Sequence, residues 1–189
     1  MSKKIFLASA AKAAFALAAV VMMSLAFAAC GSDNDDGGGG TPLLPTPTAN
    51  TVTLDGVEKP IVKAEYKDED DGDYSLYLYL SADRKERVEV LLNKDVHMTG
   101  NPVKLTEKEK KHGGKWYWVV NYHTADGATL IETYADPDSS DPVFKTGTLT
   151  MSGSPTGTIN IKLENGRVKG INGKEYSLTM SYSGPITKR

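Results

Sequence analysis

The chain has 189 residues, with 22 basic and 24 acidic side chains and a formal net charge of −2. This balance excludes a protein that coats nucleic acid, because such proteins carry a strong positive excess. Cys30 is the single cysteine, so an internal disulfide and a multi-cysteine zinc site are also excluded. The length corresponds to about one domain.

The first 29 residues have the pattern of a targeting peptide. Lys3 and Lys4 give a positively charged N-terminal region. The apolar stretch that follows ends in small residues directly before Cys30. This ending, LAFAAC at 25–30, resembles the bacterial lipobox. The resemblance implies cleavage before Cys30 and acylation of its thiol, with membrane lipid as a partner. A membrane-spanning anchor over Ala13–Ala29 is the alternative, since this stretch is nearly long enough to cross a bilayer.

Residues 30–50 are predicted to be the lipidated cysteine and a flexible tether. Gly37–Gly40 favour flexibility, and Pro42, Pro45 and Pro47 favour extended backbone. An acidic segment directly after the cysteine consists of Ser32, Asp33, Asn34, Asp35 and Asp36. It resembles the export signal of Bacteroidetes lipoproteins, which implies a location on the outer face of the outer membrane. A solvated acidic spacer is the alternative.

Residues 51–189 are predicted to form a single all-β domain of about nine or ten short strands. Apolar and polar residues alternate in 74–80 and again in 176–182, as in an antiparallel sheet with one solvated face. Residues 116–120 are apolar on both faces, which predicts a central strand. The pattern fits an antiparallel sandwich or a partly closed barrel and does not distinguish between them.

Four dipeptides predict hairpin turns, because type I′ turns require positive φ at both central residues. They are Asp55-Gly56, Asp126-Gly127, Asn165-Gly166 and Asn172-Gly173. A short repeat, TGTLTM at 146–151 and TGTINI at 156–161, predicts two adjacent strands joined by a turn. Residues 106–111 could form a short helix that begins with a capping box, or a charged loop.

Four segments of the domain carry a further resemblance: VKLT at 103–106, FKTGTL at 144–149, GTINIKL at 157–163, and 173–184. Together they are similar to a group of Bacteroidales cell-surface lipoproteins. The matching positions are glycines, turns and strand cores. The resemblance therefore implies a fold and a location, and it carries over no site residues.

Candidate metal ligands are scattered along the chain. The acidic run 68–73 and the loop 136–142 offer oxygen ligands for calcium, but a solvated turn is favoured at both. If Gly72 takes the glycine position of an EF-hand loop, the first ligand position falls on Lys67, which cannot bind the ion, and the prolines and serines of the second loop account for it as a turn. His97, His112 and His123 are not spaced as metal ligands, so we expect surface histidines and no metal or cofactor. A zinc site would require them to converge in the fold.

The aromatic residues give the best indication of function. Tyr77 and Tyr79 lie opposite the leucine face of their predicted strand, and Trp116 and Trp118 share one face of theirs. If these faces are exposed, the rings could stack on sugar rings, whereas packing in the core is the alternative.

The sequence as a whole predicts a lipid-anchored, surface-exposed lipoprotein with a non-enzymatic binding or structural role. Its partner would be an extracellular glycan or protein. A glycan-binding accessory lipoprotein that uses exposed tryptophan and tyrosine is one alternative. A small hydrolase is another, because the carboxylate pair of a glycosidase has no local signature and no other catalytic motif is found.

Overall fold

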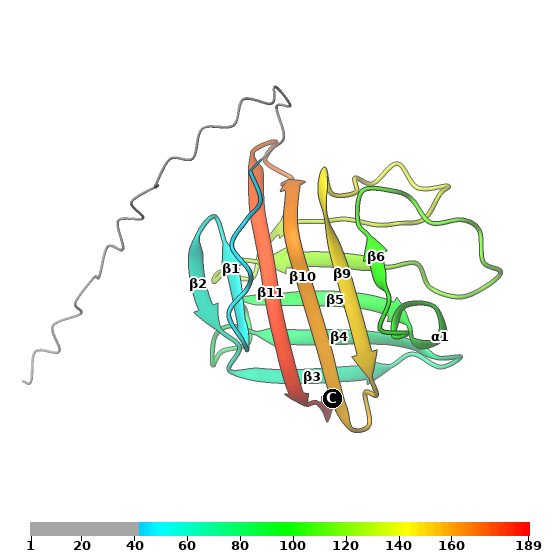
Figure 1. Cartoon of the computed structure of the whole chain (residues 1–189). Coiled ribbons are helices and arrows are strands. Elements are labelled where there is room, and N and C mark those ends of the chain that lie inside the picture. Colours follow the sequence, from blue (N-terminus) through cyan, green and yellow to red (C-terminus); the bar gives the residue numbers. More distant parts are fainter. Residues whose placement is uncertain (1–41) are drawn as a thin grey trace, which may run out of the picture. The chain divides into compact units, whose positions relative to one another are not determined.

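A computed structural model describes residues 42–189 of the chain. Within these residues the structure contains twelve β-strands and one short helix, and the strands form two six-stranded sheets. The sheets pack face to face, and Figure 1 shows the strands of one sheet running across those of the other. The predicted all-β class is confirmed, and the architecture is a sandwich. No helix in the described part has the length and hydropathy needed to cross a membrane.

The first sheet has the strand order β2-β1-β11-β10-β9-β6. In that order its strands span Val57–Pro60, Thr51–Leu54, Glu175–Pro185, Thr158–Lys169, Thr146–Gly153 and Pro102–Lys104. The second sheet has the order β12-β3-β4-β5-β7-β8. In that order its strands span Thr187–Lys188, Lys63–Asp68, Asp73–Tyr79, Arg87–Asn93, Val119–His123 and Thr129–Ile131. All paired strands are antiparallel except β12 and β3.

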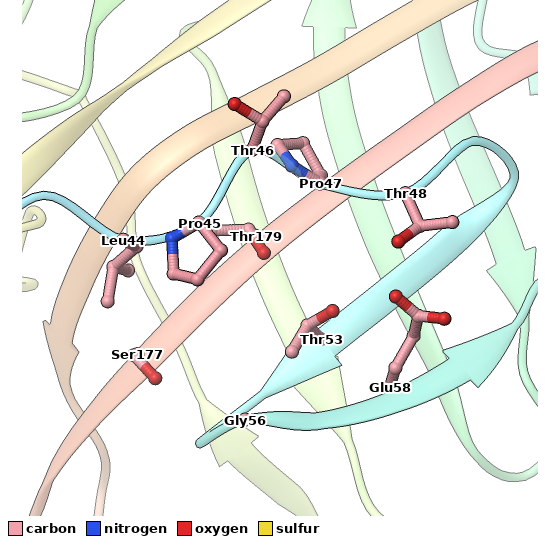
Figure 2. A pocket seen from close by; sticks show the side chains of 10 residues that line it. All are labelled: Leu44, Pro45, Thr46, Pro47, Thr48, Thr53, Gly56, Glu58, Ser177 and Thr179. Atoms are coloured by element: carbon pink, nitrogen blue, oxygen red, sulfur yellow. The ribbon is translucent and has the colours of Figure 1, made fainter. Parts of the chain in front are cut away.

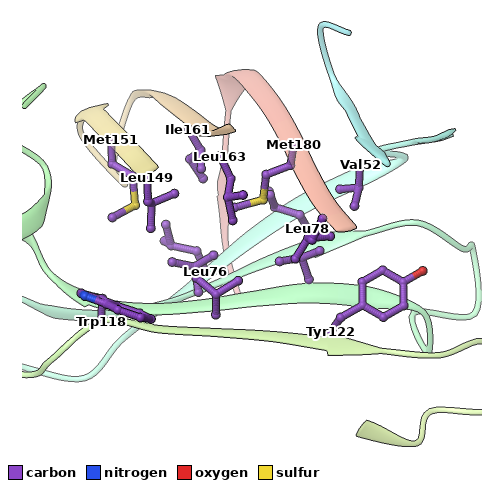
Figure 3. Close-up of a cluster of buried hydrophobic side chains, with 14 of the residues drawn as sticks. Val52, Leu76, Leu78, Trp118, Tyr122, Leu149, Met151, Ile161, Leu163 and Met180 are labelled. Atoms are coloured by element: carbon purple, nitrogen blue, oxygen red, sulfur yellow. The ribbon is translucent and has the colours of Figure 1, made fainter. Parts of the chain in front are cut away.

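The hydrophobic core fills the space between the two sheets (Figure 3). Leu76 and Leu78 of β4 point inward and are fully buried, as the alternation predicts. From the opposite sheet, Leu178 and Met180 of β11 are also fully buried. Trp118 lies at one end of this core, where its ring meets Phe144 edge to face with the ring centroids 6.4 Å apart. One continuous apolar layer therefore holds both sheets together.

Three of the four predicted turns are hairpin turns. Asp55-Gly56 joins β1 to β2, Asp126-Gly127 joins β7 to β8, and Asn172-Gly173 joins β10 to β11. The repeat at 146–161 is confirmed as two adjacent strands, β9 and β10, joined by a turn.

The fourth turn prediction, Asn165-Gly166, is wrong. These residues lie inside β10, where the register shifts against both neighbouring strands. Asn165 has a φ of 54°, so the dipeptide supplies the positive φ that a bulge needs. A Cβ on Gly166 would lie 2.3 Å from the carbonyl oxygen of Leu178, so the close strand approach requires glycine.

The predicted central strand over 116–120 begins only at Val119, the first residue of β7. Side-chain carboxylates bind the preceding backbone in place of a neighbouring strand. The N–H of Trp116 donates to Asp73 Oδ1 over 3.0 Å, and the N–H of Trp118 donates to Glu109 Oε2 over 3.2 Å. Residues 106–111 form a loop, and the helix is α1, Lys94–His97, which follows β5.

The last residues of the predicted tether, 42–50, lie against the outer face of the first sheet (Figure 2). The N–H of Leu44 donates to Asn165 Oδ1 over 2.8 Å, and Arg167 donates to the carbonyl of Pro42 over 3.1 Å. Thr179 of β11 lies beneath this segment and is only 5% exposed. The folded unit therefore begins before Thr51, and the rest of the predicted tether lies outside the described residues.

Candidate functional site

Tyr77 and Tyr79, predicted as stacking residues, lie on the outer face of β4 beneath charged side chains. Their rings stack on each other with the centroids 6.2 Å apart. The guanidinium of Arg189 lies 4.9 Å from the ring centre of Tyr77, and that of Arg84 lies 5.8 Å from that of Tyr79. Both tyrosines are buried, so the exposed face that stacking on a ligand requires is absent at these two residues.

Trp116 and Trp118, the two tryptophans predicted as stacking residues, differ in burial. Trp118 is fully buried in the core and cannot stack on a ligand, whereas Trp116 is partly exposed. Trp116 lines a groove with a volume of about 350 Å³ on the outer face of the second sheet. The floor of this groove comes from the outward-facing residues of β5 and β7, Leu91, Val119 and Asn121.

Both aromatic and polar side chains line this groove. Tyr117 and Tyr134 line it together with Trp116, and the two tyrosine rings meet edge to face with the centroids 6.2 Å apart. Glu132 and Asp141 are exposed carboxylates in the same lining. The groove therefore combines flat apolar rings with hydrogen-bonding groups, the usual composition of a small-molecule binding site.

The walls of the groove are held by hydrogen bonds to their backbone. Lys108 Nζ donates to the carbonyls of Tyr134 and Asp141, each over 2.7 Å. Asn121 Oδ1 accepts from the N–H of Thr133 over 3.1 Å, which fixes the amide on the groove floor. Sequence reasoning missed Tyr134, because it lies outside any strand and had no alternation to mark it.

The prediction of surface histidines is wrong for two of the three. His97 is fully buried and His123 is 8% exposed, because each ring faces a carboxylate inside the fold. His123 Nε2 lies 3.2 Å from Glu89 Oε2. His97 and His112 converge instead on one carboxylate, Glu109, a convergence that the spacing in the sequence does not indicate.

We call His97, Glu109 and His112 the histidine–glutamate cluster. His97 Nε2 lies 2.9 Å from Glu109 Oε1, and His112 Nε2 lies 3.3 Å from Glu109 Oε2. Burial alone would raise the pKa of Glu109, but hydrogen bonds from both histidines and from the N–H of Trp118 outweigh it and hold this pKa below its ordinary value. Among the described residues, this cluster is the group of side chains that could hold a metal ion.

The two acidic loops are turns, as expected. Asp70 and Asp71 are exposed, whereas Asp73 is buried and accepts from Asn93 Nδ2 over 2.7 Å. The loop 136–142 is closed by short-range contacts such as the one from the N–H of Asp138 to Asp136 Oδ1, 2.9 Å long.

The predicted lipidation site Cys30 and the predicted export segment Ser32–Asp36 lie outside the described residues. Comparison of the chain with protein-family models, curated proteins and solved structures finds no match.

Proposed function

We propose that this chain is a lipid-anchored protein on the outer face of the outer membrane, and that its β domain binds an extracellular glycan without catalysing a reaction. The anchor and the location rest on two features of the sequence. One is the small-residue run that ends at Cys30, and the other is the acidic segment Ser32–Asp36. Glycan binding rests on the groove.

The groove supports a sugar ligand because its side chains match the two kinds of surface on a sugar ring. The C–H faces of a pyranose are apolar and stack on aromatic rings, which Trp116, Tyr117 and Tyr134 supply. The hydroxyl groups need acceptors and donors, which Glu132 and Asn121 supply. This combination in one groove is the observation on which the proposal depends.

A glycan array probed with residues 31–189 tests this proposal. We expect binding to a limited set of glycans, and weaker binding by about tenfold or more in Trp116→Ala and in Tyr134→Ala. Each substitution removes one aromatic wall of the groove. Affinities for the best glycan would be measured by titration calorimetry on the wild type and both variants.

Val62→Ala is the matched control, because Val62 is an exposed apolar residue outside the groove. It should bind the same glycans with unchanged affinity. Equal binding by all four proteins would contradict the role of the groove, and an array without signal would contradict a glycan as ligand. Release of reducing sugar from a bound glycan would show an enzyme instead.

Replacing Cys30 with alanine tests the anchor separately. We expect the variant to lose incorporation of labelled fatty acid, because the thiol is the acylation site that the sequence predicts. It should also leave the membrane fraction, since several acyl chains are needed for stable anchoring. Cell fractionation and immunoblotting measure this, with Cys30→Ser as a second variant that also lacks the thiol. Membrane retention of both variants at the wild-type level would contradict the proposed anchor.

A further inference from the structure

The histidine–glutamate cluster lies beside the groove and has no part in the glycan binding proposed above. We infer that His97, Glu109 and His112 bind one divalent transition-metal ion of the zinc type. The set of two imidazoles and one carboxylate is one that zinc accepts with three protein ligands and an open fourth position. This inference goes beyond the proposed function. The result of a metal-binding experiment does not depend on whether the groove binds a glycan.

The spacing of the three ligand atoms suits a small ion. All three lie within 4.8 Å of one another. A tetrahedral zinc with bonds of about 2.0–2.1 Å separates its ligand atoms by about 3.3 Å. His112 Nε2 is 3.3 Å from Glu109 Oε2, and His97 Nε2 is 2.9 Å from Glu109 Oε1. The two histidines contact different oxygens of Glu109, so side-chain movements would be needed to bring one oxygen and both ring nitrogens onto a single ion.

The surroundings of His97 allow its ring to bind a metal without moving. Its Nδ1 lies 2.9 Å from the backbone nitrogen of Asn93 and 3.0 Å from the carbonyl oxygen of the same residue. Without metal, Nδ1 can accept from this N–H while Nε2–H donates to Glu109. With metal, Nδ1–H can donate to the carbonyl, which leaves the Nε2 lone pair for the ion. The metal-bound tautomer keeps this ring position but leaves the N–H of Asn93 without its His97 acceptor, at the cost of one hydrogen bond.

His112 and Glu109 are also positioned by their neighbours. The ring of Tyr117 packs on His112 with the centroids 4.3 Å apart, and the N–H of Trp118 donates to Glu109 Oε2 over 3.2 Å. The Nδ1 atom of His112 is buried, and no described residue forms a hydrogen bond with it. With the ion on Nε2, this Nδ1 would carry the proton of the imidazole and would still lack a partner among the described residues.

The fourth position of the ion would be open to solvent. Glu109 and His112 line a surface opening of about 350 Å³, and the Glu109 side chain is 14% exposed. Lys104, Lys108, Lys110 and Lys111 line this opening. Lys104 is paired with Glu107 at 3.6 Å and Lys111 with Asp138 at 2.6 Å, and Lys108 donates to the carbonyls of Tyr134 and Asp141. The two ion pairs reduce the repulsion between the lysines and a bound cation, and the opening gives water access to the fourth position of the ion.

Zinc titration of residues 31–189 tests the inference, because this chain contains no cysteine. The protein would carry no polyhistidine tag, and Zn²⁺ affinity would be measured by competition with a chromogenic indicator. We expect one Zn²⁺ per chain, and affinity lower by about tenfold or more in His112→Gln and in Glu109→Gln. Both positions are partly exposed, so the variants should remain folded.

His123→Gln is the matched control, because His123 also faces a glutamate but is no part of the cluster. It should bind Zn²⁺ as the wild type does. Imidazole ¹⁵N NMR of the wild type needs no variant, and zinc should shift the His97 and His112 signals while leaving His123 unchanged. The inference is overturned if the wild type shows no stoichiometric binding, if His112→Gln and His123→Gln bind equally, or if the His97 signals stay unchanged.

Discussion

Replacing Trp118 with alanine should lower the free energy of unfolding by about 3–5 kcal/mol, which is among the largest effects expected for a core substitution. The indole is fully buried and meets Phe144 across the core, so its loss leaves a cavity that the strands cannot close. Urea unfolding followed by circular dichroism would measure the change. The protein should stay folded in water with a lower midpoint and an unchanged slope.

Two companion variants make this result specific. Trp116→Ala should cost less than about 1 kcal/mol, because Trp116 is partly exposed and its hydrogen bond to Asp73 comes from the backbone. Trp118→Phe should cost less than Trp118→Ala, since it keeps most of the ring volume and removes a buried indole N–H that has no described partner. Equal destabilisation by Trp116→Ala and Trp118→Ala would contradict the assignment of one residue to the groove and the other to the core.

Glu86→Ala should lower the free energy of unfolding by about 2–3 kcal/mol at neutral pH. Glu86 joins the two sheets: its Oε1 accepts from Lys59 Nζ of β2 over 2.7 Å and from the Tyr122 hydroxyl of β7 over 2.5 Å. Without the carboxylate, the Tyr122 hydroxyl is left buried without this partner. Chemical unfolding at pH 7 would measure the loss.

The same variant should also change the dependence of stability on pH. Burial alone would raise the pKa of Glu86, but the hydrogen bonds from Lys59 and Tyr122 outweigh it and lower this pKa below the ordinary value of 4.5. The stabilisation is therefore present above pH 4.5 and is lost as the pH falls through the lower pKa of the folded state. In Glu86→Ala, the free energy of unfolding should therefore fall less steeply as the pH is lowered below 4.5.

Lys59→Ala provides the control for Glu86→Ala. The Lys59 side chain is 38% exposed, so its removal should cost less than about 1 kcal/mol and leave the contact with Tyr122 in place. If Lys59→Ala lowered the free energy of unfolding as much as Glu86→Ala does, the stabilisation would come from the exposed ion pair and not from the buried contact with the Tyr122 hydroxyl.

Local patterns predicted much of this fold because strand alternation and hairpin turns are local properties. The inward set of β4, with Leu76 and Leu78, follows directly from a period of two. Asn165-Gly166 was misassigned because a hairpin turn and a bulge require the same positive φ, and only the partner strands distinguish them. The strand before Val119 was extended too far because the carboxylates that bind this backbone come from distant residues.

The candidate sites were less predictable because long-range contacts create them. Tyr77 looks like an exposed aromatic in the sequence, and only the fold brings the C-terminal Arg189 over its ring. His97 and Glu109 are 12 residues apart with no regular element spanning them, so no periodicity places them together. Trp116 was recognised from its residue type, whereas its separation from Trp118 depends on where β7 begins.

The course of residues 42–50 has a consequence for orientation. This segment crosses the outer face of the first sheet, whereas the groove lies on the outer face of the second. The chain therefore enters the domain on the side opposite the groove. Residues 42–50 therefore leave the groove uncovered, and the aromatic side chains that line it stay accessible to a ligand.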